Sequence, residues 1–207
     1  MATDFLHDTH PTGKMFNSYA FGGYFVYHLA PALPVFIDGR LDIYDSKVWA
    51  DSLAVEENRL PIEEIEKRYG VTLWVVQADD AYGDPEHLAS RLAKRADYAL
   101  VHFDDRTSIF VKRLPANEAY IREHGFTSIS PWDLRGSMIA MRDPARRETA
   151  TTEIDRALTQ SYGSATASII AAAAAEAAGD KRAAGQFLSE ARARQPDHPL
   201  LPSARRR

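Results

Sequence analysis

Short apolar runs alternate with amphipathic stretches over the first half of the chain and are absent from its second half. Four of these runs predict strands, at residues 14–17, 35–37, 71–76 and 98–103. The run at 71–76 gives the clearest signal, because it is rich in β-branched and aromatic residues and carries no charge. A fifth run, at 108–112, follows the polar turn 104–106 and predicts the return strand of a hairpin.

Apolar residues at helical spacing fill the stretches between these runs. They predict one helix that begins at Gly22-Gly23 and is stopped by Pro31, and further helices at residues 4–8, 45–57, 62–69, 85–96 and 117–125. Gly70 suits the C-terminal cap of the helix 62–69. The order of strands and helices predicts an α/β fold with a three-layer, mostly parallel sheet and an antiparallel edge hairpin.

The composition then divides the chain into an α/β domain at 1–115, a connecting segment at 116–142 and a helical tail at 143–207. The connecting segment has mixed signals. The tail is rich in alanine, arginine and glutamate and predicts helices at 145–162, 165–178 and 181–195.

Polar residues follow the first two predicted strands. In a parallel sheet the carboxyl ends of strands share one rim, so Asn17, Tyr19, Asp38, Arg40 and Asp42 are expected to gather there, with the loops at 79–80 and 104–105. Gly22-Gly23 could cradle a phosphate or simply permit a tight turn. Asp38 and Arg40 could bind a sugar or a cation, or could pair with each other as part of the structure.

The net charge and the missing residue types exclude several classes of function. The net charge of -4 argues against nucleic acid as a partner, and the absence of cysteine excludes thiol catalysis and cysteine metal sites. There is no GxSxG motif. His7 and His10 with their neighbouring aspartates fit the solvated face of a short helix better than a metal site. We therefore expect no catalytic residues, no metal and no cofactor, and neither a signal peptide nor a segment that spans a bilayer.

The last two predicted helices resemble the hairpin of a tetratricopeptide repeat. The turn, second-helix and terminal-proline positions of that motif are taken by Gly179-Asp180, Ala184, Leu188, Ala191 and Pro196. The first helix has alanines where the motif has larger residues, so the resemblance covers one degenerate repeat. A single repeat cannot bury its own face and must pack on the α/β domain, on another subunit or on further repeats.

Two blocks in the first domain carry a second resemblance. FNSYAFGGY at 16–24 and VFIDGR at 35–40, followed by Tyr69-Gly70-Val71, resemble the soluble domain that follows the membrane part of bacterial polytopic glycosyltransferases dependent on dolichyl-phosphate sugars. The likeness covers about residues 2 to 113. The layout is also similar to the soluble domain of oligosaccharyltransferases, although the tryptophan-rich part of that motif is absent.

In those families the catalytic carboxylates and the lipid-phosphate site lie in membrane loops. The resemblance therefore implies a non-catalytic accessory domain on the extracytoplasmic face of a bacterial membrane, which helps to position an acceptor or a partner. Its partner would be its own membrane domain or another protein, and its ligand a glycan or a lipid phosphate. The candidate binding residues are Asn17, Tyr19, Gly22, Gly23, Tyr24, Asp38, Arg40 and Asp42.

Two alternatives stay open. The chain could be a free-standing interaction module that binds a protein through its helical tail. It could also be a small enzyme that uses the carboxylates of the rim on a phosphorylated sugar.

Overall fold

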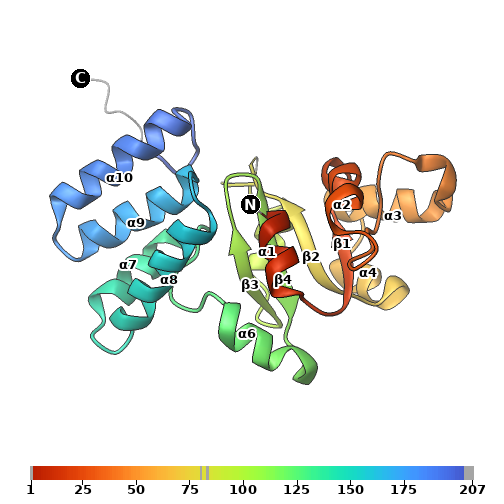
Figure 1. Cartoon of the computed structure of the whole chain (residues 1–207), viewed down its shortest axis with the longest axis horizontal. Coiled ribbons are helices and arrows are strands. Elements are labelled where there is room, and N and C mark those ends of the chain that lie inside the picture. Colours follow the sequence, from red (N-terminus) through yellow and green to blue (C-terminus); the bar gives the residue numbers. More distant parts are fainter. Residues whose placement is uncertain (1, 80, 83, 203–207) are drawn as a thin grey trace. The chain divides into compact units, whose positions relative to one another are not determined.

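The computed structural model describes residues 2–79, 81–82 and 84–202. The chain forms two compact units, of which the first comprises 2–102 and 106–125 (Figure 1). The second comprises Phe103–Asp105, at the tip of a hairpin, and the chain from Phe126 onward. The chain is thus a mixed α/β protein with a C-terminal set of helices.

The first unit is built on one mixed four-stranded sheet in the order β1-β2-β4-β3 (Figure 1). Its strands are β1 (Lys14–Asn17), β2 (Val71–Gln77), β3 (Tyr98–Phe103) and β4 (Thr107–Lys112). β1 pairs parallel with β2, and β2 pairs antiparallel with β4. The strand positions predicted at 14–17, 71–76, 98–103 and 108–112 are confirmed.

Two expectations about the sheet are wrong. Only one pair of neighbouring strands is parallel, because β4 lies inside the sheet and β3 forms its edge. β4 is buried along almost its whole length, which suits a strand that is paired on both sides. The segment 35–37 is not a strand, and the side chain of Asn17 takes up its backbone groups instead.

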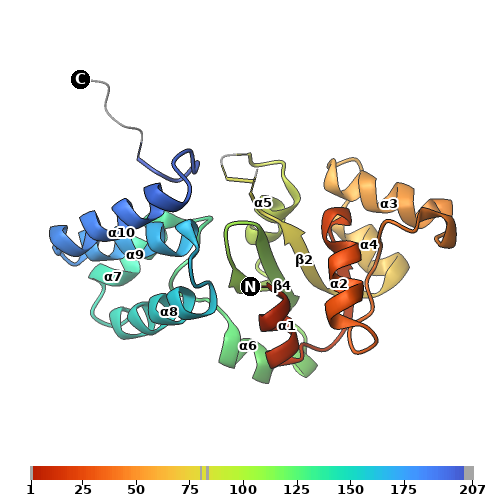
Figure 2. The same cartoon turned by 45° about the horizontal axis from the view of Figure 1, so that its top comes forward.

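Several helices pack against the sheet. On one face α1 (Ala2–Thr9), α2 (Gly22–Leu29) and α6 (Glu118–His124) contribute to a core around Leu73, Val75 and Ile109. Figure 2 shows α1 and α2 side by side. Phe16, Trp74 and Phe110 are also buried, at positions that alternate with that core along the strands. α4 (Ile62–Tyr69) and α5 (Leu88–Ala93) contact β2.

The remaining elements of the first unit connect these parts. α3 (Ser46–Glu56) packs on α4, whose C-terminal cap Gly70 has the predicted left-handed conformation with φ 73°. Short 3-10 helices lie at η1 (Tyr19–Phe21), η2 (Leu41–Ile43) and η3 (Pro115–Asn117). α5 is shorter than predicted, because residues 85–86 form a turn and His87, which follows in a bend, caps the helix by accepting from the Ala89 amide at 3.2 Å through Nδ1.

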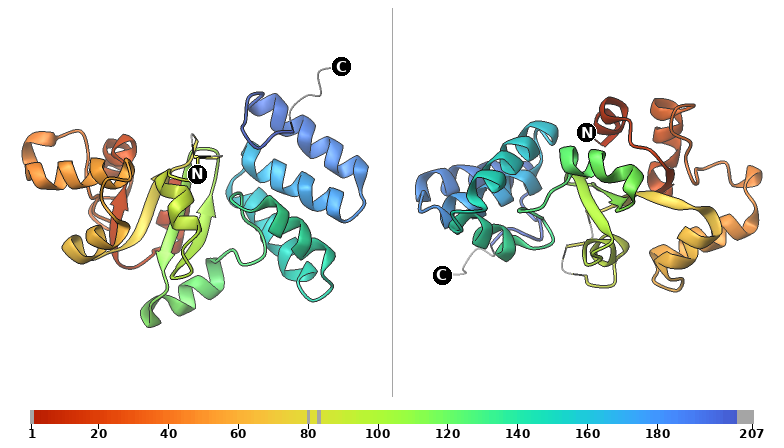
Figure 3. Two further views of the ribbon diagram at one scale, coloured as in Figure 1. Left: turned by 180° about the vertical axis from the view of Figure 1, so that it is seen from behind. Right: turned by 90° about the horizontal axis from the view of Figure 1, so that it is seen from below.

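The described part of the second unit contains four helices, which lie side by side (Figure 3). They are α7 (Leu134–Arg142), α8 (Arg147–Gln160), α9 (Ala165–Ala177) and α10 (Lys181–Arg194). The last three were predicted within a few residues. α7 was not, and it begins where Asp133 accepts a hydrogen bond from the Gly136 amide at 2.7 Å.

Candidate functional site

The sequence motif folds into one corner at the carboxyl end of β1. Asn17 is fully buried, and its Nδ2 donates to the Ile37 carbonyl at 2.9 Å and to the Ser18 carbonyl at 3.1 Å. Its Oδ1 accepts from the Phe36 amide at 2.8 Å. Asn17 therefore joins the two blocks of the motif, and all of its polar atoms serve that purpose.

Gly22 packs directly against the chain that Asn17 holds. A Cβ on Gly22 would lie 2.5 Å from the Asp38 Cα and would also meet the Ile37 carbonyl oxygen. A Cβ on Gly23 would meet nothing within 4 Å. Because the chain itself fills the space before Gly22, the first glycine is required for close packing.

Asp38 is the centre of a closed ionic cluster. Its side chain is almost completely buried, and it accepts from Arg40 Nε at 3.0 Å, Arg40 Nη2 at 2.6 Å, the Arg40 amide at 2.8 Å and the Tyr44 hydroxyl at 2.8 Å. The hydrogen bonds from Arg40 hold the pKa of Asp38 far below its usual range, against the effect of burial. Burial raises the pKa of Tyr44, with a further contribution from Asp38.

This cluster leaves little capacity for catalysis. A carboxylate that stays ionised and accepts four hydrogen bonds can neither donate a proton nor act readily as a base. Arg40 is 59% exposed, but its fork is already engaged by Asp38. Asp42 is exposed in η2 and takes no part in the hydrogen bonds of the cluster.

An uncharged aromatic surface lies next to this corner. No Asp, Glu, Lys or Arg occurs between Tyr19 and Ile37. Tyr24 and Tyr27 are 48% and 83% exposed, and both rings contact the His28 ring, with centroids 4.2 and 4.8 Å apart. Tyr19 is 38% exposed and meets Trp49 edge to face at 5.0 Å. We call Tyr24, Tyr27 and His28, which all lie on α2, the aromatic face.

Two carboxylates near the corner have roles that the sequence reasoning missed. Burial raises the pKa of Glu56, while hydrogen bonds from the Ser18 side chain and the Tyr19 backbone oppose that rise. Asp51 is buried and binds Arg68 Nη1 at 2.8 and 2.9 Å and the Tyr69 hydroxyl at 2.8 Å. Both residues lie on α3, and the local pattern of that helix gave no sign of either contact.

The loop carboxylates expected on the same rim belong to different parts of the structure. One oxygen of Asp79 is buried without a hydrogen-bond partner among the described residues, and Asp80 lies outside them. Asp105 belongs to the second unit, where it caps α9. His7 and His10 lie exposed on and just after α1, with ring centroids 5.9 Å apart. Among the described residues, no three side chains of His, Asp or Glu are grouped as metal ligands would be.

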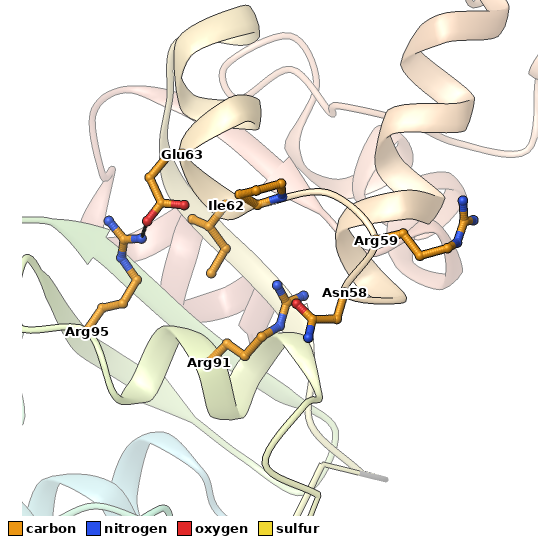
Figure 4. Close-up of a pocket in the computed structure, with 7 residues that line it drawn as sticks. Asn58, Arg59, Ile62, Glu63, Arg91 and Arg95 are labelled. Atoms are coloured by element: carbon orange, nitrogen blue, oxygen red, sulfur yellow. Dashed lines mark hydrogen bonds and ion pairs between the residues drawn. The ribbon is translucent and has the colours of Figure 1, made fainter.

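One open pocket, of about 410 Å³, lies between α4 and α5 (Figure 4). It is lined by Asn58, Arg59, Pro61, Ile62, Glu63, Arg91 and Arg95. Its guanidinium groups are engaged within the protein. Arg95 binds Glu63 and Asp97, Arg59 binds Glu57, and Arg91 donates to the carbonyls of Val55 and Glu86. Arg91 thus joins α5 to α3, and Arg95, just after α5, binds α4, whereas the Arg59–Glu57 pair is local.

No described helix is both long and apolar enough to cross a bilayer. Comparison of the chain with models of known families, with curated proteins and with solved structures found no match.

Proposed function

We propose that this chain is a non-catalytic accessory domain of a bacterial membrane glycosyltransferase-like protein, placed on the extracytoplasmic side, where it holds an acceptor or a partner. The observation that carries the proposal is the closed corner. In the residues that resemble the glycosyltransferase-associated motif, the side chains of Asn17 and Asp38 form hydrogen bonds within the motif itself. Gly22 allows its two blocks to pack closely. A motif used in this way builds a rigid platform rather than a reaction centre.

The platform presents the aromatic face. Tyrosine combines a large apolar ring with a polar tip, and such side chains are favoured at surfaces that bind sugars, proteins or the bilayer interface. We infer a three-layer arrangement, with α1, α2 and α6 on one side of the sheet and α4 and α5 on the other. The sheet would then support α2 on its buried side and leave its tyrosines exposed. Tyr24 and Tyr27 are then the first residues to meet a glycan acceptor or the membrane domain.

The reaction test uses the purified chain with a polyprenyl-phosphate sugar and a glycan acceptor. We expect no transfer, because the buried carboxylates of the corner are saturated. Turnover by the chain alone would refute the proposal.

The binding test titrates the chain with the same glycan and with vesicles of zwitterionic and anionic phospholipids, followed by NMR. We expect Tyr24→Ala with Tyr27→Ala to weaken whichever binding is seen at least tenfold. Tyr162→Ala is the matched control, because Tyr162 is 91% exposed in the second unit. Equal loss in the control, or none in the double variant, would exclude the aromatic face.

The same titration separates structure from recognition at Asp38. Asp38 is buried and accepts four hydrogen bonds, although its partner Arg40 is 59% exposed, and we expect Asp38→Asn to melt below the parent chain. If Asp38→Asn and Arg40→Ala melt like the parent yet lose binding, the corner is itself a recognition site.

A protein-interaction role for the helical unit is the second candidate. α9 and α10 form a hairpin that turns at Gly179, with φ 86°, and Asp180 caps α10 by accepting from the Ala183 amide at 2.9 Å. Such a hairpin fits the single degenerate repeat and would bind a protein in trans. An enzyme acting on a phosphorylated sugar has less support, because the arginines of the pocket between α4 and α5 are paired with carboxylates or bound to carbonyls.

A further inference from the structure

The segment after α10 folds back onto the second unit. Leu200 and Leu201 pack on a buried apolar cluster formed by Ala165, Ile169 and Ala191, together with Leu134 of α7. Residues 196–202 have no regular helix or strand that would hold them in place. Their position therefore depends on this apolar contact and on a few hydrogen bonds.

Most of those hydrogen bonds meet at His198, which is only 4% exposed. Its Nδ1 lies 3.1 Å from the Leu200 amide, and its Nε2 lies 2.9 Å from the Thr166 hydroxyl. The backbone amide can only donate, so Nδ1 must carry the lone pair and Nε2 the proton. Nε2 then donates to Thr166, and Thr166 donates to Asp105 Oδ1 at 2.9 Å.

This chain of donors works only with a neutral imidazole. A second proton on Nδ1 would face the Leu200 N–H, so the bond would be lost and a charge would be buried. The strap, defined here as residues 196–202, is thus fastened by a group that titrates near neutral pH.

Charged groups of the described residues lie near His198. The Asp105 carboxylate is reached only through Thr166, and it also accepts from Ser164 Oγ and from the amides of Ala165 and Thr166. Arg194 of α10 donates at 3.0 Å to the Oγ of Ser168, which lies on α9 together with Thr166. Asp197, next to His198 in the sequence, is exposed. Burial lowers the pKa of His198, and the attraction of Asp105 offsets this only in part.

We propose that the strap is a pH-dependent device, closed on the second unit at neutral pH and released when His198 takes up a proton. Release would uncover the apolar surface of α9 around Ala165 and Ile169. The inference does not depend on the proposed glycosyltransferase role.

The direction follows from linkage. A histidine whose pKa is lowered in the closed state binds protons more readily in the open state, so closure is fully favoured above the ordinary pKa of about 6.5. As the pH falls below about 6.5, the ratio of open to closed strap rises roughly tenfold per pH unit, until the pKa of the closed state is reached.

The experiment measures hydrogen exchange at the Leu200 and Leu201 amides of the whole chain between pH 8 and pH 5, as protection factors corrected for intrinsic rates. NMR titration of the His198 ring is recorded alongside. We expect His198 to titrate below pH 6.5, and the two protection factors to fall together at acid pH while those of α9 persist.

His198→Gln supplies the test by substitution and His28→Gln the control, because His28 lies exposed in the first unit. We expect the protection factor of Leu201 to become independent of pH in His198→Gln and to keep its pH dependence in His28→Gln. An unchanged protection factor of Leu200 in the parent chain from pH 8 to pH 5 would overturn the proposal, as would equal pH dependence in the parent and His198→Gln.

Discussion

Gly22 and Gly23 are adjacent in sequence and identical in type, yet their surroundings differ completely. The main chain of Ile37 and Asp38 closes on the first, while the second faces open space. The same contrast holds for charged residues. Asp38 is locked by Arg40 and Tyr44, whereas Asp42 is exposed. Residue types singled out this part of the sequence as a candidate site. The role of each residue, however, depends on the atoms that lie against it in the fold.

At this scale we predict that Gly22→Ala destabilises the chain by about 1–3 kcal/mol, because the new methyl group meets backbone atoms that cannot rotate away. Gly23→Ala should be neutral or should stabilise by up to about 1 kcal/mol, because alanine favours a helix and nothing obstructs it. The free energy of unfolding in urea measures both. Equal effects of the two substitutions would contradict the close packing at Gly22.

Single elements are fastened by side chains far from them in sequence. Glu153 of α8 is buried and accepts four hydrogen bonds from the loop before α7: from the Thr127 amide at 2.8 Å, the Thr127 hydroxyl at 2.7 Å, the Ser128 amide at 2.8 Å and the Ile129 amide at 3.0 Å. Three consecutive amides that converge on one carboxylate form an anion nest that the chain fills itself. The loop without regular structure is thereby fixed to α8.

Glu153→Gln should cost roughly 2–3 kcal/mol, because the amide nitrogen can only donate and would face backbone donors. Glu148→Gln, exposed in the first turn of the same helix, should cost under about 1 kcal/mol. Thermal and urea unfolding followed by circular dichroism compare the two variants. If Glu148→Gln lowered the stability as much as Glu153→Gln, the loss would come from the charge on α8 and not from the hydrogen bonds of the nest.

The two units of the whole molecule depend on their chain neighbours to different degrees. The core around Leu73 and Val75 draws its buried residues only from the first 121 positions. The second unit, in contrast, uses Asp105 from the β3–β4 turn to cap the first amides of α9. A cut after Gly125 therefore leaves the first unit its core and removes a cap from the second.

We predict that the fragment 1–125 keeps its fold, with dispersed NMR signals and a cooperative melt. The fragment 126–207 should melt at a lower temperature than the same helices in the whole chain, because losing an N-cap costs roughly 0.5–2 kcal/mol. Asp105→Asn in the whole chain should reproduce part of that loss. The asymmetry is refuted if the fragment 126–207 is as stable as the intact unit.

The sequence by itself determined the elements that local chemistry encodes. β2 follows from uncharged β-branched and aromatic residues, the end of α4 from Gly70, and the α9–α10 hairpin from Gly179 and Asp180. These signals lie within a few residues of the structure that they specify, so they can be interpreted without knowledge of distant partners.

The tertiary structure alone decided which groups become partners. β4 took an inner position in the sheet, and the segment 35–37 gave its backbone hydrogen bonds to Asn17 instead of a strand. Asp105 reached α9, about 60 residues away, and Glu56 reached Ser18. Folding buries donors and acceptors from distant parts of the chain, and each needs a hydrogen-bond partner. Which groups become partners depends on the whole fold, so the local sequence does not show it.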